Sequence, residues 1–340
     1  MAKILVTGGT GYIGSHTVVE LHNAGYEVVI LDNLSNSNIK ILTQLHAITG
    51  KWHDFHEIDL QDDKAVQEFA ERHTDISGII HFAAYKAVGE SVEQPLKYYK
   101  NNFYGLINLL TSFNEKINFV FSSSCTVYGQ PDTLPVTEAA PVKKAESPYG
   151  NTKQIAEEIL EETAAVTPSL NVIALRYFNP VGAHETALIG ELPNGVPANL
   201  VPFITQSAIG KRGPIRVYGD DYDTPDGSAI RDYIHVVDLA KAHVAAIKRL
   251  EENKVSSNYE VFNVGTGKGT SVLEIIAAFE KSTSAKLEYQ IGPRRAGDII
   301  QIYGDVTKSN EVLGWKANLD INEMMRSAWE WEKYIKANPF

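Results

Sequence analysis

A tyrosine and a lysine four residues apart, Tyr149 and Lys153, are the two side chains of this sequence with the clearest chemical potential. Ser147 and Pro148 precede them and are typical of a helix N-cap and a first helical position, so both side chains face the same way in the first turns. A free phenol has a pKa of about 10, but a neighbouring ammonium group and a helix N-terminus both favour the phenolate. We therefore expect a lowered pKa for Tyr149 and proton exchange with a hydroxyl group.

A serine at the end of an expected strand offers this pair a partner. Ser124 follows the apolar run 118–123, and ligands of open parallel sheets bind beyond the carboxyl ends of the strands. Each signal alone is weak, because chance supplies about one such Tyr/Lys spacing and a strand-end serine is usually a turn former or helix cap. Together, Ser124, Tyr149 and Lys153 are a candidate proton-transfer set.

A glycine-rich loop predicts a dinucleotide beside them. Gly9, Gly11 and Gly14 follow the first apolar run and open a helix, which fits the G-x-G-x-x-G pattern of pyrophosphate binding. Asp32 ends the second run, where a carboxylate contacts the adenosine ribose. The next basic residue is Lys40, so no close cation would hold a 2′-phosphate, and NAD is favoured over NADP.

Other candidates have an ordinary structural interpretation. Cys125 lacks a nearby histidine to form a thiolate and is interpreted as a small buried residue. His53 and His56 lie on the strand-like run 53–59, where a separation of three places them on opposite faces, so no metal site is predicted. Arg231 and the 294–298 segment are short basic spots, which fit either surface salt bridges or bidentate contacts to a diphosphate.

Strands and helices that alternate along the sequence must position these side chains. Strand-like runs at residues 3–7, 27–32, 78–83, 118–123 and 171–178 are separated by segments of helical spacing, which predicts a Rossmann-type, doubly wound parallel α/β sheet. From residue 180 to 226, Gly, Pro, Asn and Asp become dense, which indicates a loop-rich substrate region. We expect an NAD-binding domain at 1–178, a smaller C-terminal substrate domain at 179–340, and a return of about 231–265 to the first.

Composition narrows the class of protein. The 340 residues suggest about two domains, and the net charge of −11 argues against nucleic-acid or membrane partners. A single cysteine excludes an internal disulfide and favours a reducing compartment. The apolar start is too short for a signal peptide, and no run reaches the ~20 residues of a membrane span. A cytoplasmic enzyme is expected.

Taken together, these residues resemble the extended short-chain dehydrogenase/reductase family over nearly the whole chain. The resemblance rests on residues 6–17 (VTGGTGYIGSHT), 31–34 (LDNL), 81–91 (HFAAYKAVGES), 122–129 (SSSCTVYG), 147–150 (SPYG), 176–184 (RYFNPVGAH) and 231–236 (RDYIHV). It implies reversible epimerisation of UDP-galactose and UDP-glucose at carbon 4 by an NAD-dependent isomerase of galactose metabolism. In that reaction Tyr149 and Ser124 handle the proton of the 4-hydroxyl, and Lys153 tunes Tyr149 and holds the nicotinamide ribose.

The resemblance also implies binding residues. The NAD site would be lined by Gly8, Gly11, Tyr12, Ile13, Gly14, Asp32, Asn33, Asn36, Asp59, Leu60, Phe82, Ala83, Lys86, Asn101, Ser124, Tyr149, Lys153 and Tyr177. The UDP-sugar would be held by Ser124, Tyr149, Asn179, Asn199, Leu200, Arg216, Tyr218, Arg231, Arg295, Asp298 and Ile302. Family members with a bulky aromatic at the position of Ile302 exclude N-acetylated sugars, and those with a small residue accept them, so the intermediate isoleucine leaves UDP-N-acetylhexosamines open.

Two alternative functions and the oligomeric state remain to be considered. A 4,6-dehydratase of this family normally has an acid pair after the strand-end serine, where this chain has Cys125 and Thr126. A non-catalytic NAD-sensing protein would need the glycine loop but not the Ser/Tyr/Lys set. Family members are usually homodimers joined through helices that correspond here to about 94–115 and 148–165, and the apolar stripe of the first would fit such a bundle.

Overall fold

The computed structural model describes residues 2–113, 117–294 and 299–340. Its centre is a parallel sheet of seven strands in the order β3-β2-β1-β4-β5-β6-β10, which extends the doubly wound Rossmann order by one strand. The strands are β1 (Lys3–Thr7), β2 (Glu27–Asp32), β3 (Asp54–Glu57), β4 (Ile76–His81), β5 (Ile117–Ser122), β6 (Leu170–Tyr177) and β10 (Tyr259–Val264). The predicted fold class is confirmed, and the predicted strand bounds agree to within two residues.

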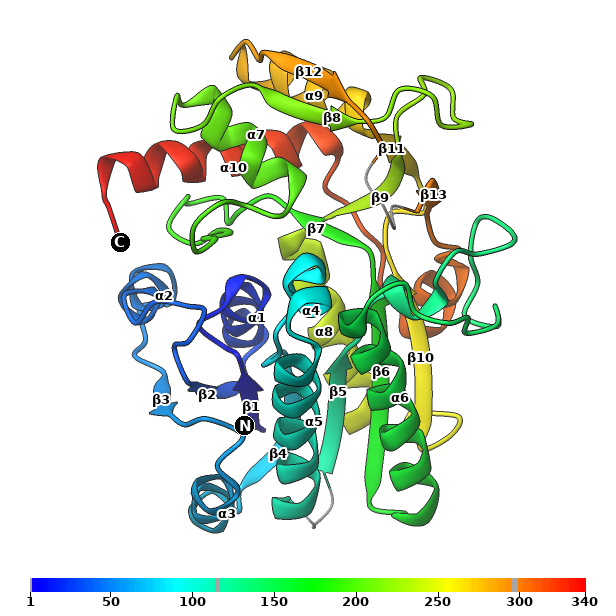
Figure 1. The fold of residues 1–340 in the computed structure, drawn as a ribbon. Helices are drawn as coiled ribbons and strands as arrows, with labels where there is room; N and C mark the ends of the chain where they lie inside the picture. The colour runs from blue at the N-terminus through cyan, green and yellow to red at the C-terminus, as the bar shows by residue number, and fades with distance from the viewer. Residues whose placement is uncertain (1, 114–116, 295–298) are drawn as a thin grey trace.

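Helices cover both faces of this sheet (Figure 1). Alternate strand residues point to opposite faces, so Ile4 and Val6 pack in one apolar cluster and Leu5 in the other. The first cluster includes side chains of α1 (Tyr12–Asn23), α2 (Ile41–Thr49) and α8 (Val236–Glu251). The second includes side chains of α3 (Asp63–Arg72), α5 (Pro95–Ser112) and α6 (Pro148–Val166). Each fully buried aliphatic side chain contributes about 1.5–3 kcal/mol, and the two clusters thereby fix the strand ends that carry the candidate site.

A smaller part lies above the carboxyl ends of the sheet (Figure 1). Its core combines side chains from β7, β8, β9, α7, α9 and α10. The elements of this part are β7 (Asn179–Val181), α7 (Leu200–Ala208), β8 (Ile215–Tyr218), β9 (Ile230–His235), β11 (Gly269–Ser271), α9 (Val272–Thr283), β12 (Tyr289–Gly292), β13 (Gln301–Ile302) and α10 (Ile321–Ala337). Two short helical segments, α4 (Val88–Glu93) and η1 (Cys125–Tyr128), and a π-helical turn, η2 (Ser309–Leu313), complete the described elements.

The chain crosses between the two parts more than once. After β9 it enters α8, which packs against α1, and then β10, which pairs in parallel with β6 at the edge of the large sheet. It then returns to the smaller part through β11 and α9. The large sheet is therefore completed by a strand that lies more than 80 residues beyond β6 in the sequence.

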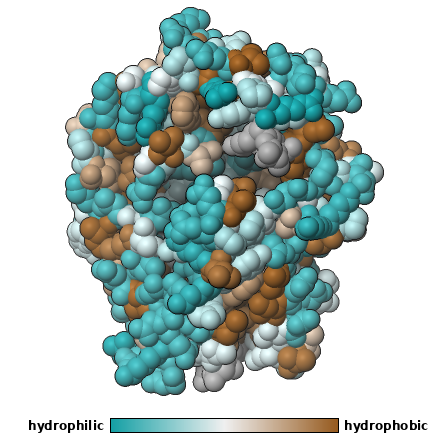
Figure 2. Space-filling view, in the orientation of Figure 1, coloured by the Kyte–Doolittle hydropathy of each residue, from teal (hydrophilic) through white to brown (hydrophobic). Residues whose placement is uncertain are grey.

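The surface in the orientation of Figure 1 is predominantly polar, with apolar side chains scattered between polar ones where α5 and α6 lie (Figure 2). On α5, Leu96, Tyr104 and Ile107 are 80%, 50% and 42% exposed. Leu96 and Ile107 belong to the apolar stripe expected from the sequence, and its other members are partly or fully buried: Tyr99, Phe103, Leu106 and Leu110. Among the described helices, none is long and apolar enough to cross a membrane.

Candidate active site

The glycine-rich loop connects β1 to α1 at the point where the connections of the sheet diverge. Gly8 has φ +70°, and a Cβ there would lie 2.9 Å from the backbone nitrogen of Ala83, which follows β4. A Cβ on Gly14 would lie 2.1 Å from the carbonyl oxygen of Gly8, so the loop closes tightly onto the helix. Gly11 is the N-cap of α1 and provides no side-chain cap. The first amides of α1 therefore fit a pyrophosphate.

Asp32 is positioned for the ribose of such a dinucleotide. It is buried at the end of β2, where its Oδ1 accepts hydrogen bonds from the backbone nitrogen of Leu34 at 2.9 Å and from Ser37 Oγ at 3.0 Å. Its Oδ2 accepts one from the backbone nitrogen of Thr10, at 3.2 Å, which ties the carboxylate to the glycine loop. These hydrogen bonds hold the Asp32 carboxylate next to the glycine loop, in a position that fits the ribose of NAD.

The other predicted cofactor residues follow the same strand ends. Asn33 and Asn36 follow β2, Asp59 and Leu60 follow β3, and Phe82, Ala83 and Lys86 follow β4. Tyr12 and Ile13 open α1, Asn101 lies on α5, and Tyr177 ends β6. The structure thus gathers these side chains at one edge of the sheet, as parallel strands require.

Two of these residues bridge the two parts of the fold. Tyr12 Oη donates to the carbonyl oxygen of Gly182 at 2.7 Å, and Lys86 Nζ lies 3.5 Å from the carboxylate of Glu191. Both partners belong to the segment after β6. The cofactor loop is therefore held against the region expected to bind substrate.

Ser124 and Tyr149 meet at the carboxyl end of β5. Ser124 caps η1 and accepts a hydrogen bond from the backbone nitrogen of Thr126 at 3.2 Å. Ser147 caps α6 as the sequence predicts, accepting from the backbone nitrogen of Gly150 at 3.1 Å, so Tyr149 falls in the first turn. The Tyr149 side chain is buried and hydrogen-bonds with Ser124.

Burial sets the pKa of Tyr149 in the direction opposite to the sequence-based expectation. Removing a phenolate from water raises the pKa of Tyr149 well above its ordinary value, and the hydrogen bond with Ser124 only opposes this rise. The helix start and the following lysine do not outweigh this cost. A further positive charge is required before Tyr149 can act as a base at neutral pH.

Lys153 lies one turn further along α6 and reaches the end of β5. Its Nζ donates to the carbonyl oxygen of Ser122 at 2.6 Å and lies 4.7 Å from the ring centre of Phe121. Burial lowers the pKa of Lys153 to about 8, against the opposing charge of Glu157. Lys153 is thus a buried cation whose proton is easily lost.

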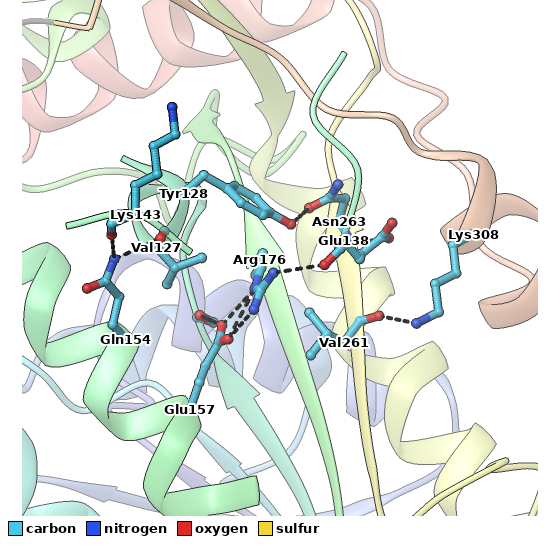
Figure 3. Close-up of polar contacts among 11 residues, drawn as sticks. Val127, Tyr128, Glu138, Lys143, Gln154, Glu157, Arg176, Val261, Asn263 and Lys308 are labelled. Carbon is cyan, nitrogen blue, oxygen red and sulfur yellow. Dashed lines mark hydrogen bonds and ion pairs between the residues drawn. The ribbon is translucent and has the colours of Figure 1, made fainter. Parts of the chain in front are cut away.

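Glu157, one further turn along α6, joins this helix to two strands. It accepts three hydrogen bonds from the guanidinium of Arg176 on β6, at 2.5, 3.0 and 3.1 Å, and one from Ser123 Oγ, next to Ser124. Both charged side chains are almost fully buried (Figure 3). Such a pair fixes helix and strands in one relative position, because neither charge can be left alone in the interior. The sequence analysis missed Glu157, although its place four residues after Lys153 on the same helix face was a usable signal.

This ion pair continues into a wider polar network (Figure 3). The Arg176 guanidinium lies 4.9 Å from the ring centre of Tyr128, whose Oη donates to Asn263 Oδ1 at 2.7 Å. Asn263, on β10, receives a hydrogen bond at its amide oxygen and also donates from its backbone to Glu138, at 2.8 Å. The segment behind Ser124 is thereby tied to the returning strand β10.

The predicted substrate residues are spread over the smaller part. Asn179 lies on β7, Asn199 is the N-cap of α7, and Leu200 is the first residue of α7. Arg216 and Tyr218 lie on β8, and the Arg216 guanidinium is 5.5 Å from the Tyr218 ring centre. Arg231 on β9 is paired in register with Ile302 on β13. Arg295 and Asp298 lie outside the described residues.

Ile302 belongs to the wall behind the candidate proton-transfer set. It is buried in an apolar cluster with Cys125, Phe178 and Val127. Cys125 is buried as expected, and burial raises the pKa of its thiol to about 12. His184, His235 and His243 are also buried, and burial lowers their pKa values.

Comparisons with known proteins identify the family of this chain. A model of the GDP-mannose 4,6 dehydratase family matches residues 5–328. A UDP-glucose 4-epimerase of Haemophilus influenzae is 50% identical over 97% of this chain and 97% of that relative. A crystal structure of UDP-glucose-4-epimerase from Stenotrophomonas maltophila, with bound NAD and formylated UDP-arabinopyranose, has a TM-score of 0.95 at 44% identity and covers 99% of both chains. A UDP-Glc/GlcNAc 4-epimerase from Campylobacter jejuni has a TM-score of 0.83 at 37% identity over 98% of this chain and 100% of that one.

The fold, the glycine loop and the Ser/Tyr/Lys set define a nucleotide-sugar enzyme of the extended short-chain dehydrogenase/reductase type. Within that class, the chain belongs to the UDP-glucose 4-epimerase family. The expected family and the expected NAD cofactor are therefore confirmed.

Replacing Glu157 by glutamine tests the role of the buried ion pair. We expect the free energy of unfolding to fall by about 3–5 kcal/mol, because the Arg176 charge then remains buried without its counter-charge. Urea unfolding measures this change. The neighbouring, exposed Glu158→Gln is the matched control and should change stability by less than about 0.5 kcal/mol. A similarly small change in Glu157→Gln would contradict the argument.

The lowered pKa of Lys153 predicts a pH-dependent stability. The unfolded chain holds this proton up to its ordinary pKa of 10.5, whereas the folded chain releases it at about 8. Between these values the unfolded state binds more protons, so the stability of the wild type relative to Lys153→Met should rise with pH. Urea unfolding of both proteins from about pH 7 to about pH 10 measures the difference. A difference that does not vary with pH would show that Lys153 is not held as a desolvated cation.

Proposed function

We propose that this protein interconverts UDP-galactose and UDP-glucose at carbon 4, as an NAD-dependent isomerase of galactose metabolism. The observation that carries the proposal is that Tyr149 hydrogen-bonds with Ser124 and that Lys153 reaches the carbonyl oxygen of Ser122, both at the carboxyl end of β5. The glycine loop follows β1 at the same edge of the sheet. The substrate class follows from the family to which the chain belongs.

Tyr149 is the group that moves the proton. Its Oη takes the proton of the hexose 4-hydroxyl, and Ser124, which hydrogen-bonds with Tyr149, orients the two oxygens. When bound, an oxidised nicotinamide supplies an acceptor for the hydrogen of carbon 4 and a positive charge that favours the Tyr149 phenolate. Tyr149 later returns the proton to the same oxygen, which regenerates the phenolate. The hydrogen of carbon 4 returns to the opposite face of the sugar, so no net oxidation occurs.

Lys153 and the residues around it hold this arrangement. Its Nζ, fixed on the Ser122 carbonyl at 2.6 Å, is placed to hold the ribose next to the nicotinamide. Because the side chains around Lys153 are buried, water is kept away from the reacting groups and does not compete for the proton. The remaining members of the cofactor site are those positioned at the strand ends and in the first turn of α1.

The smaller part holds the UDP group in this proposal. Arg216 and Arg231 supply the planar cations that suit a diphosphate, and Tyr218 supplies a ring for stacking. Residues 1–178 with the returning α8 and β10 then bind the cofactor, and the rest of residues 179–340 binds the nucleotide-sugar. Firm anchoring of the diphosphate leaves the hexose free to turn over, so that either face of carbon 4 can be presented to the nicotinamide.

Dehydration is disfavoured by the residues that follow Ser124. Elimination of water needs an acid and a base beside the sugar, and these positions are Cys125 and Thr126. The Cys125 thiol is buried with a raised pKa, so it is a poor proton donor. The dehydratase name of the matching family model therefore does not extend to this chain.

The exposed apolar face of α5 supports a homodimer. Leu96, Tyr104 and Ile107 lie along this helix, which packs against α6. Exposed apolar side chains at this spacing suit a bundle made with the same helix pair of a second copy. The dimer would then form on the face opposite to α8.

Conversion of UDP-galactose to UDP-glucose by the purified protein with bound NAD, followed by NMR, tests the proposed reaction. Tyr149→Phe should lower kcat by about 10²–10⁴-fold, because the general acid/base is lost. Tyr289→Phe, at an exposed tyrosine of β12, is the control and should keep full activity. Absence of product from the wild type would refute the activity, and full turnover by Tyr149→Phe would refute the role of Tyr149. The same assay with UDP-N-acetylglucosamine determines whether Ile302 leaves room for the acetamido group.

Leu96→Glu tests the proposed dimer. A charge at the most exposed residue of the apolar face should shift the protein toward monomers, as measured by sedimentation equilibrium. Val312→Glu introduces the same change at an exposed position of η2 and should leave the assembly unchanged. A wild type that sediments as a monomer would contradict the proposal.

A further inference from the structure

Three metal-ligating side chains lie together at the edge strand β3. Asp54 begins this strand, His56 follows two residues later on the same face, and His73 ends α3. One donor atom from each lies within 4.8 Å of the donor atoms of the other two. This cluster differs from the pair considered in the sequence, because His53 points away and stacks edge-on against His22.

The spacing of the donor atoms fits a small divalent ion. Zinc bonds of about 2.0–2.1 Å in tetrahedral geometry place ligand atoms about 3.3 Å apart. His56 Nε2 and Asp54 Oδ1 are already 3.1 Å apart, and the widest separation must close by no more than about 1.5 Å. Asp54 is exposed and both histidines are partly exposed, so rotation of these side chains suffices.

The two imidazoles are held ready for such an ion. His56 Nε2 is buried and has no hydrogen bond within the described part of the chain, although Asp54 is near. The rings of His56 and His73 meet edge to face with centroids 4.8 Å apart, and both pack on Phe69.

The surrounding charges do not oppose a cation. Lys3 is a basic residue near His73, and its Nζ forms ion pairs with Asp75 at 2.5 Å and with Glu27 at 3.5 Å. Its charge is thereby offset by two carboxylates. Asp54 adds a third negative charge directly at the cluster.

We propose that Asp54, His56 and His73 bind one divalent transition-metal ion of the zinc type. Two imidazoles and one carboxylate favour Zn²⁺ over Mg²⁺ or Ca²⁺, which prefer oxygen ligands, and water completes the coordination. The ion would connect the start of β3 to the end of α3. The bound ion would stabilise the folded protein, because it binds only to the folded chain.

This site is distinct from the proposed active site. In a parallel sheet the cofactor lies beyond the carboxyl ends of the strands, whereas Asp54 is the first residue of β3 and pairs with Val29 in the middle of β2. Glu57, at the other end of β3, pairs with Asp32. Figure 1 shows β3 and α3 at the lower left margin, away from the smaller part.

Calorimetric titration of ZnCl₂ into the untagged full-length protein tests the proposal. The wild type should bind one equivalent, and His56→Gln and His73→Gln should each weaken binding by at least the ~10–100-fold that loss of an outer-shell partner causes. His53→Gln, on the same segment but outside the cluster, is the matched control and should bind as the wild type does. Absence of saturable binding, or wild-type affinity in both cluster variants, would overturn the proposal.

A second measurement separates lost ligands from lost folding. Co²⁺ in place of Zn²⁺ should give the visible absorption of an ion bound by nitrogen and oxygen, and Asp54→Asn should change that spectrum. Asp54 is exposed, so its replacement leaves the fold intact, which thermal unfolding without metal verifies. A Co²⁺ spectrum that is the same in Asp54→Asn and the wild type would exclude the carboxylate and overturn the three-residue site.

Discussion

The candidate active site depends on a buried carboxylate that is not among the predicted binding residues. Glu157 joins α6 to β5 through Ser123 and to β6 through Arg176, so the helix that carries Tyr149 and Lys153 has one position relative to the strand that leads to Ser124. A buried ion pair of this kind is weak evidence for stability in itself, since desolvation offsets much of its attraction. Its value is geometric: proton transfer needs oxygens within hydrogen-bond reach, and a small rotation of α6 would separate them.

The same network explains why the two parts of the molecule share one site. Arg176 lies against Tyr128, and Tyr128 bonds to Asn263 on β10. Ile302, from the smaller part, packs in the same cluster as Cys125 and Tyr128. The segment 124–128 is therefore enclosed between a strand of the large sheet and a strand of the smaller one, and most of its side chains are buried.

Much of this could be predicted from local patterns. Apolar runs bounded by turn residues predicted the sheet, and the bounds of β1 and β2 were correct to the residue, because a buried strand is a continuous local signal. The pKa of Tyr149 was predicted in the wrong direction, since spacing on a helix shows a neighbouring charge but not the degree of burial. The Asp54, His56 and His73 cluster could not be predicted at all. His73 lies 17 residues beyond His56, and only the packing of α3 on the sheet brings them together.

The return of the chain into the large sheet has a consequence for biosynthesis. Strand β6 has an unpaired edge until β10 emerges from the ribosome, and α8, which covers α1, emerges just before it. A nascent chain ending near residue 178 thus exposes both a strand edge and an apolar helix face. The large sheet cannot be completed before the first segment of the smaller part, residues 179–235, has been translated. Neither unit could be exchanged for a homologous one by a single recombination event, and the two must evolve as one block.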